Sequence, residues 1–224
     1  HKSQQMNDAE IVEETITYVR ETLKDSEGGH DWFHIQRVFR NTLLIAKDEE
    51  VDVLVVSLAA LLHDIADPKF HDGNEEIGPE KASTFLEKLK IPEGQRDHVI
   101  KIIRHMSFKN TLDSPKNPFD SKELHVVRDA DRLDAMGAIG IARAFNFGGF
   151  AGRKLYDPEI APNPKMDKAA YKKNTGPTIN HFYEKLLLLK DLMHTKTGKR
   201  LAERRHQFML DFLEEFYNEW NGKA

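Results

Sequence analysis

The 224 residues of this chain are 39% hydrophobic and 31% charged, a balance that permits a buried core stable without covalent staples. The sequence contains no cysteine, which excludes disulfides, thiolate metal sites and thiol nucleophiles. A formal net charge of −4 argues against a general nucleic-acid binder, whose surface would be basic.

The longest apolar stretch, residues 53–62, is about half as long as the roughly 20 residues that cross a bilayer. We therefore expect no membrane span. The first five residues are polar and precede Met6 without the basic and apolar segments of a signal peptide. We interpret residues 1–5 as a purification-tag remnant and expect a cytoplasmic protein.

Helical periodicity dominates the first half of the chain. Capping-box spacing at Asn7 and Glu10 predicts a helix with an apolar stripe, which comprises Val12, Ile16, Val19 and Leu23. A second helix, over about residues 31–47, is predicted to face inward through Ile35, Val38, Phe39 and Ile45. A third helix, over about 53–66, should be the central buried helix, because it is apolar on nearly all sides. Asp67 before Pro68 is predicted to end it.

The second half of the chain is also predicted to be helical. Pro79 and Pro92 suit the first turns of helices over about 80–90 and 93–106. Asp120 and Glu123 have capping-box spacing at the start of a helix over about 121–145. Residues 146–177 are rich in glycine and proline and predict a long loop or lid, which in a compact domain is more often functional than idle. Two helices over 178–220 complete the chain, with apolar stripes of Ile179, Phe182, Leu186, Leu189 and Met193 and of Leu201, Met209, Phe212, Phe216 and Trp220.

His63 and Asp64 end the most buried of these helices. The ten residues before them are apolar apart from Ser57, so we expect the pair to lie in or beside the core. Because an unpaired buried charge is costly, the pair needs a partner. A divalent cation is a suitable one, since imidazole nitrogen and carboxylate oxygen together bind Mn, Fe, Co, Ni or Zn.

Further ligands are available on two other predicted helices. His34 lies one turn before Val38 on the same inward face. The helix after residue 120 offers Asp129, Asp131 and Asp134, of which the last two interrupt an apolar stripe. Asp129 should lie nearer the surface, where Arg132 can pair with it. The side of the helix on which each aspartate lies does not decide between Asp131 and Asp134 as the ligand.

The pattern of His34, His63-Asp64 and Asp131 resembles the H…HD…D signature of the HD-domain phosphohydrolase superfamily. The flanking residues 30–38, 61–67 and 129–143 are similar to those of small stand-alone bacterial members, and this likeness covers nearly the whole chain. A bare His-Asp dipeptide carries no weight, because His30-Asp31 and His71-Asp72 are two more. The four-residue pattern on separate helices is the specific signal.

The resemblance implies an all-α, single-domain HD-type helical bundle around a metal site. This domain would cover residues 6–224, with a metal-site core over about 20–145. The implied ligands of one divalent metal are His34, His63, Asp64 and Asp131. Mn²⁺ is the favoured ion, although Fe²⁺, Co²⁺, Ni²⁺, Zn²⁺ and Mg²⁺ suit such donors too.

Several nearby residues are candidates for the chemistry around the metal. Asp67, one turn past His63 and Asp64, is expected to orient water or pass protons together with that pair, unless it only ends the helix. Lys69 stands where HD proteins often carry a phosphate-facing lysine. His105 is a candidate substrate contact, and Arg153 and Lys154 could bind distal phosphates from the loop. The alternative for these four is an ordinary packed or solvated side chain.

The function implied is hydrolysis of a small phosphorylated substrate, a nucleotide by preference. We expect nucleoside triphosphates to be cleaved to monophosphate and pyrophosphate. A nucleotidase or phosphodiesterase is the near alternative, and a non-catalytic nucleotide-sensing module is the alternative from another class. No nucleic-acid or membrane partner is expected, and the aromatic last helix is compatible with a homodimer.

Overall fold

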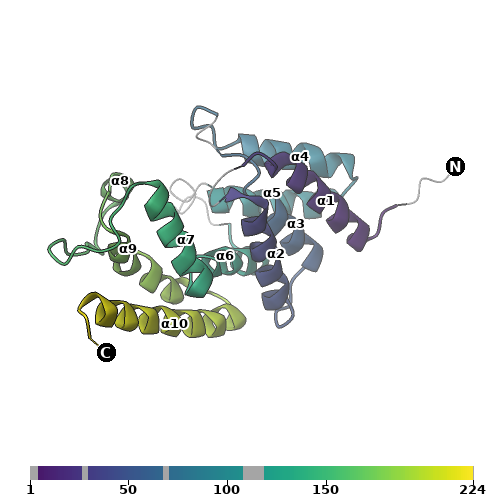
Figure 1. Cartoon of the computed structure of the whole chain (residues 1–224). Coiled ribbons are helices and arrows are strands. Elements are labelled where there is room, and N and C mark those ends of the chain that lie inside the picture. The colour runs from purple at the N-terminus through teal and green to yellow at the C-terminus, as the bar shows by residue number, and fades with distance from the viewer. Residues whose placement is uncertain (1–4, 27–29, 68–70, 108–118, 224) are drawn as a thin grey trace. The chain divides into compact units, whose positions relative to one another are not determined.

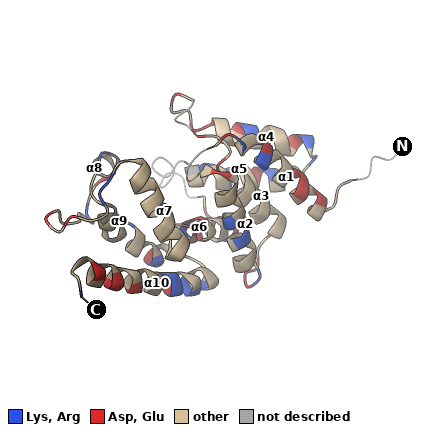
Figure 2. Ribbon diagram, in the orientation of Figure 1, with Lys and Arg blue, Asp and Glu red and all other residues tan. Residues whose placement is uncertain are grey.

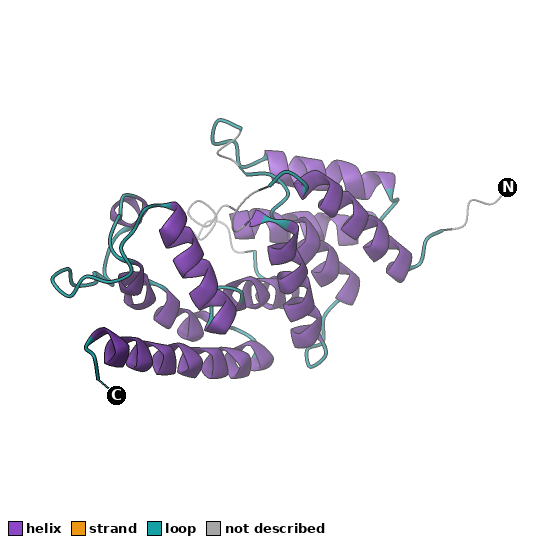
Figure 3. Cartoon of the chain, in the orientation of Figure 1, coloured by secondary structure: helices purple, strands orange, loops and turns teal. Residues whose placement is uncertain are grey.

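The computed structural model of the chain describes residues 5–26, 30–67, 71–107 and 119–223, and every regular element within these ranges is a helix (Figures 1 and 3). This confirms the predicted all-α class. The helices are α1 (Asp8–Leu23), α2 (Trp32–Ala46), α3 (Val53–Leu62), α4 (Ile77–Lys88), α5 (Glu93–Ser107), α6 (Lys122–Leu133), α7 (Gly137–Phe150), α8 (Lys168–Lys172), α9 (Thr178–Glu184), the 3₁₀ helix η3 (Leu186–Leu192) and α10 (Lys196–Trp220). None of them is long and apolar enough to cross a membrane.

The chain forms two compact units, residues 1–130 and 131–224. The boundary falls inside α6, whose first nine residues belong to the first unit and whose last turn opens the second. Asp131 is therefore carried by a continuous helix that begins in the first unit.

Short polar side chains begin the first three helices. Asn7, Asp31 and Asp52 each adopt extended backbone angles and accept a hydrogen bond from the backbone N–H three residues on. Each bond satisfies a donor that the helix leaves without an internal partner. The start predicted at Asn7 is thus confirmed. Glu123 accepts from the backbone N–H of Asp52, so the predicted capping box at α6 is wrong, and the hydroxyl of Ser121 caps that helix instead.

Helix α3 is the centre of the first unit, as the sequence predicts. All of its residues except Val53 are buried, and it packs against α1, α2 and α5. The helix ends at Leu62, four residues before the predicted end, so His63 is its C-cap. On α1 the predicted positions Val19 and Leu23 are buried, but the first two buried residues are Ile11 and Thr15, each one position before the predicted Val12 and Ile16.

The helix predicted over residues 121–145 is two helices in the structure. The break lies at Met136, which is extended, and at Gly137, whose φ of +71° is strained for any residue with a side chain. A Cβ on Gly137 would also approach Cγ of Arg205 to 3.0 Å. The same break lets Arg143 reach Asp134, with 3.1 Å between Arg143 Nη1 and Asp134 Oδ2.

The loop predicted from residue 146 starts later, because α7 continues to Phe150. Gly148 lies in α7 so close to Thr178 that a Cβ there would collide with the threonine hydroxyl. The following segment is tied to α9 by two backbone hydrogen bonds, from Thr178 to Lys154 and from Ile179 to Leu155. Glu184 of α9 accepts two more, from the backbone of Asn163 and the side chain of Asn174. Within the second unit, this segment is thus fastened to α9 at several points.

The last two predicted apolar stripes have different outcomes. All five residues of the first stripe are buried, although Lys185 interrupts the helix and η3 continues it in a tighter form. On α10 the prediction is only partly correct, since Met209 is buried but Trp220 is exposed, and the buried positions are Thr197, Gly198, Ala202, Met209 and Leu213.

Charge is unevenly distributed along α10. Figure 2 shows Lys and Arg in its first half and Asp and Glu in its second half. Both ends therefore oppose the helix dipole, which favours anions at the N-terminus and cations at the C-terminus. Aromatic packing holds the second half of α10 within its unit: Phe212 stacks on Phe182 with ring centroids 5.8 Å apart, and the ring centroid of Phe145 lies 5.9 Å from that of Phe212.

His181 in α9 is held neutral by its surroundings. Burial, together with the positive charges of Lys185 and Arg153, lowers the pKa of His181 from 6.5 to about 4. Its Nδ1 lies 3.3 Å from the hydroxyl of Tyr171. Because the unfolded chain takes up the proton first, this histidine stabilises the fold above about pH 6.5 and loses that contribution as the pH falls toward 4.

Replacing Leu61 of α3 by alanine should lower the free energy of unfolding by about 2–5 kcal/mol, because the side chain is fully buried and its loss leaves a cavity in the core. Chemical denaturation followed by circular dichroism measures this loss. The matched control Leu44→Ala removes the same atoms from a side chain that is 41% exposed and should cost about 1 kcal/mol or less. Equal losses would contradict the central position of α3.

Substituting His181 by asparagine should make stability less sensitive to acid. Between pH 7 and pH 5 the wild type is expected to lose about 2 kcal/mol more than the variant, at roughly 1.4 kcal/mol per unit of pKa difference. Urea denaturation of both proteins at the two pH values tests this, and other titrating groups cancel in the comparison. Parallel losses in the two proteins would show that His181 does not have the depressed pKa.

Candidate metal centre

His34 stands in the first turn of α2 and is buried. The carboxylate of Asp31, which caps the helix, accepts a hydrogen bond of 3.0 Å from the backbone N–H of His34. The cap therefore fixes the backbone that carries this imidazole, and the apolar residues Ile35 and Val38 anchor the same face of α2 in the core.

His63 is the C-cap of α3 and is half-buried. Its Nδ1 lies 2.7 Å from the carbonyl oxygen of Ala60. A carbonyl oxygen only accepts, so Nδ1 must carry the proton of the neutral ring. Nε2 then has the free electron pair that a metal ligand needs, which is the usual role of such a bond behind a ligating histidine.

Asp131 lies in the last turn of α6 and is partly exposed. The residue before it, Ala130, is joined to α2 by a hydrogen bond of 3.2 Å from the side-chain amide of Asn41 to its carbonyl oxygen. This bond connects α2 to α6 beside the carboxylate. It helps to explain why Asp131 is close to a histidine that lies almost a hundred residues earlier.

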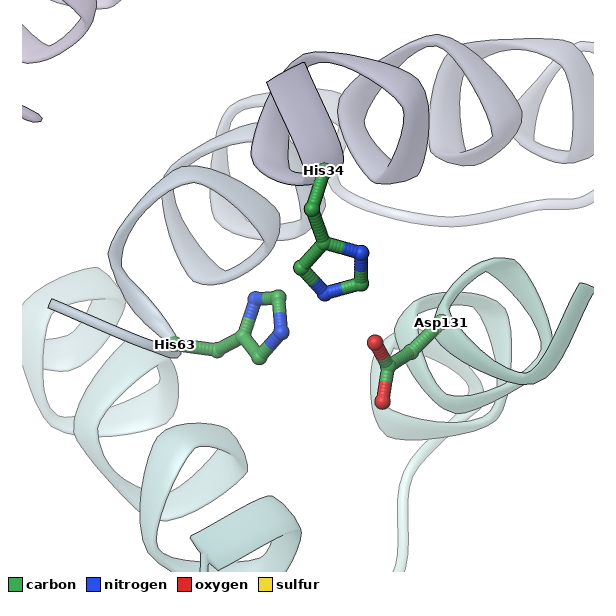
Figure 4. A group of neighbouring side chains, drawn as sticks. All are labelled: His34, His63 and Asp131. Atoms are coloured by element: carbon green, nitrogen blue, oxygen red, sulfur yellow. The ribbon is translucent and has the colours of Figure 1, made fainter. Parts of the chain in front are cut away.

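These three side chains converge. One potential ligand atom from each of His34, His63 and Asp131 lies within 4.8 Å of the other two, and Figure 4 shows both rings and the carboxylate turned toward one another. The imidazole centroids are 6.1 Å apart with the ring planes at 69°. Two imidazole nitrogens and a carboxylate oxygen at this spacing suit a first-row divalent cation bound at about 2.0–2.2 Å.

The aspartates of α6 differ from the sequence interpretation in one respect. The prediction that Asp129 lies nearer the surface than Asp131 is wrong, because Asp129 is fully buried and Asp131 is partly exposed. Helix α6 buries residues on several sides, so a single apolar stripe could not decide which carboxylate faces inward. Asp134, the open alternative, is buried and paired with Arg143 and does not belong to the convergent group.

Asp64, the fourth predicted ligand, makes a different contact. Its Oδ2 lies 2.7 Å from Nδ1 of His30, and it is not part of the group formed by His34, His63 and Asp131. The sequence interpretation set His30-Asp31 aside as a bare dipeptide and missed this neighbour. The available signal was its position one helical turn before His34.

Other predicted site residues in the first unit are placed as follows. Asp67 is half-buried, just beyond the turn that carries His63 and Asp64. His105 is buried near the end of α5, with Nδ1 2.9 Å from the carbonyl oxygen of Lys101 and its ring 4.7 Å from that of Phe119. Lys69 lies outside the described residues.

Arg153 and Lys154 belong to the second unit and have partners there. The guanidinium of Arg153 donates to the carbonyl oxygen of Asn174 over 2.9 Å and lies over the ring of Phe147. The ammonium of Lys154 lies 3.3 Å from Asp157, and this hydrogen bond, after the larger effect of the backbone N–H of Glu159, contributes to lowering the pKa of Asp157. Both cations therefore hold the loop segment in this structure.

The sequence of this chain is similar to those of known proteins. Residues 32–136 match the model of the HD domain family. The uncharacterized protein YpgQ of Bacillus subtilis (strain 168) is 39% identical over 94% of this chain and 94% of its own length. A protein of Acanthamoeba polyphaga mimivirus, L803, is 26% identical over 88% of this chain and 93% of its own.

Solved structures extend the likeness to the whole fold. The crystal structure of an HD-superfamily hydrolase from Bacillus thuringiensis has a TM-score of 0.79 and 42% sequence identity, covering 97% of this chain and 100% of that one. YpgQ of Bacillus subtilis in complex with ADP has a TM-score of 0.75 and 36% identity, covering 96% of this chain and 97% of that one. With the helical fold and the group of His34, His63 and Asp131, these matches place the chain in the HD domain family, as a metal-dependent phosphohydrolase.

Proposed function

We propose that this enzyme hydrolyses nucleoside triphosphates to nucleoside monophosphates and pyrophosphate. The observation that carries the proposal is the ADP complex of YpgQ, a relative that covers nearly the whole chain. ADP combines a nucleoside with linked phosphates, which is the part of the substrate that a pyrophosphohydrolase has to recognise. A centre of imidazole and carboxylate groups fits the same chemistry, because a divalent cation bound there would offset the charge of a phosphoryl group.

Mn²⁺ is the ion we propose for the centre, bound by His34, His63, Asp64 and Asp131. When bound, the cation lowers the pKa of water and offsets negative charge that develops on a phosphoryl group. The two imidazoles and two carboxylates hold the ion, and their net charge of −2 leaves little excess charge to repel a phosphate. The hydrogen bond from His63 to Ala60 keeps Nε2 available as a ligand atom.

The remaining residues serve the substrate in this proposal. Asp67, half-buried beyond the turn after α3, orients the attacking water or accepts its proton. His105 and Lys69 contact the substrate. Arg153 and Lys154 bind its distal phosphates, which requires each to exchange its present partner, Asn174 or Asp157, for a phosphate oxygen.

Metal binding is tested by replacing His63 with alanine. The affinity for Mn²⁺ should fall by at least about 100-fold, because an imidazole ligand is lost, and isothermal titration calorimetry measures it. The control is His71→Ala, which removes a histidine also followed by aspartate but outside the convergent group. It should bind Mn²⁺ like the wild type. Equal losses of affinity in both variants, or none in either, would contradict the proposed centre.

The phosphate products distinguish the proposed pyrophosphohydrolase reaction from its alternatives. With Mn²⁺ and a panel of nucleoside triphosphates, the wild type should release one pyrophosphate for each monophosphate formed, while His63→Ala prepared in parallel should release neither. Ion-exchange chromatography separates the nucleotides, and enzyme-coupled assays measure pyrophosphate and orthophosphate independently. Orthophosphate released from nucleoside monophosphates, or products of a phosphodiester substrate alone, would overturn the proposal in favour of a nucleotidase or a phosphodiesterase.

A further inference from the structure

His30 lies at the start of the helix that carries His34. It is the residue before the N-cap Asp31 and stands four positions, about one helical turn, before His34. The cap bond from His34 to Asp31 fixes the backbone between the two histidines. His30 is thus placed by the same local structure that places a member of the convergent group.

The contact of His30 joins this helix start to the end of α3. Nδ1 of His30 lies 2.7 Å from Oδ2 of Asp64, the residue that follows His63. A carboxylate accepts hydrogen bonds and does not donate them, so Nδ1 is the donor. The distance is that of a strong, charge-assisted hydrogen bond. One bond therefore links the two segments that supply both imidazoles of the centre.

Exposure indicates what this bond does. The side chain of His30 is 61% exposed and that of Asp64 is 25% exposed. An ion pair as open as this contributes about 0–1 kcal/mol to stability, so the pair is not required for folding. Its distinctive effect is geometric, because one of the two carboxylate oxygens is occupied and the other is left for a different partner.

We infer that His30 is a positioning residue for the metal centre. Its Nδ1–H holds Oδ2 of Asp64, so that Oδ1 is the oxygen offered to the cation, and His30 itself does not ligate. The inference rests on the proposed role of Asp64 as a metal ligand. A hydrogen-bonded partner behind a ligating carboxylate restricts its rotation, and loss of such partners typically weakens metal binding by roughly 10- to 100-fold.

Two substitutions of His30 test whether its N–H donor, rather than the whole imidazole ring, supports metal binding. His30→Ala removes the donor, whereas His30→Asn keeps an N–H at nearly the place of Nδ1. By calorimetric titration with Mn²⁺, His30→Ala should bind roughly 10- to 100-fold more weakly than the wild type, and His30→Asn should recover most of that loss. His71→Ala, the control for loss of a histidine outside the convergent group, should bind normally, and thermal unfolding without metal should be alike in all four proteins.

A spectroscopic measurement distinguishes positioning from ligation. Electron spin-echo envelope modulation of bound Mn²⁺ counts the coupled imidazole nitrogens. The inference expects two histidines, His34 and His63, in both the wild type and His30→Ala. A third histidine that disappears in His30→Ala would overturn it, and so would unchanged Mn²⁺ affinity in that variant.

Failure of the proposed centre gives a different result. If His63→Ala also keeps wild-type Mn²⁺ affinity, or if the wild type binds no Mn²⁺, the centre itself is wrong and the role of His30 falls with it. If His63→Ala loses Mn²⁺ while His30→Ala does not, the centre stands and only the role of His30 is refuted.

Discussion

The burial of α3 is the constraint on which the rest of the structure depends. Its residues from Leu54 to Leu62 are buried against α1, α2 and α5, so the helix has essentially no freedom to rotate or slide. His63 is the next residue, where the apolar run gives way to a polar turn. An imidazole attached to so rigid a support reaches one point in the first unit, and His34 reaches the same point from α2. Rigid support of this kind is what a metal site requires.

Much of the fold and of the metal centre could be predicted from the sequence, because the relevant signals are local. The apolar run of α3 and the cap at Asn7 depend on residues close together in the chain. Imidazole and carboxylate groups that interrupt apolar surfaces need partners, which made His34, His63 and two aspartates of α6 candidates. The resemblance to the HD-domain superfamily then selected Asp131 over Asp134. The structure brings His34, His63 and Asp131 together. Asp64 as a ligand, and the roles of Asp67 and the basic loop residues, remain predictions.

The features that could not be predicted depend on contacts between distant segments. Asp129 is buried because α6 is covered on several sides, which a single helical stripe does not reveal. The break before α7 follows from the backbone of Gly137 and its contact with Arg205, nearly seventy residues later. The contact of His30 with Asp64 likewise spans 34 positions. In each case the residue types were visible, but the pairing was set by tertiary packing.

The hydrogen bond from His63 to Ala60 gives one side chain two duties. Ala60 supplies one of the last carbonyl oxygens of α3, a group that a helix leaves without an internal partner at its C-terminus. The ring that we propose to bind a cation through Nε2 thus uses Nδ1 to satisfy the end of its own helix. A mutation of His63 would remove the hydrogen bond to Ala60 at the end of α3 and, under the proposed function, also a metal ligand. If a related protein evolved into a non-catalytic, ligand-sensing form, we therefore expect the first substitutions at other members of the centre, whose side chains do not cap a helix.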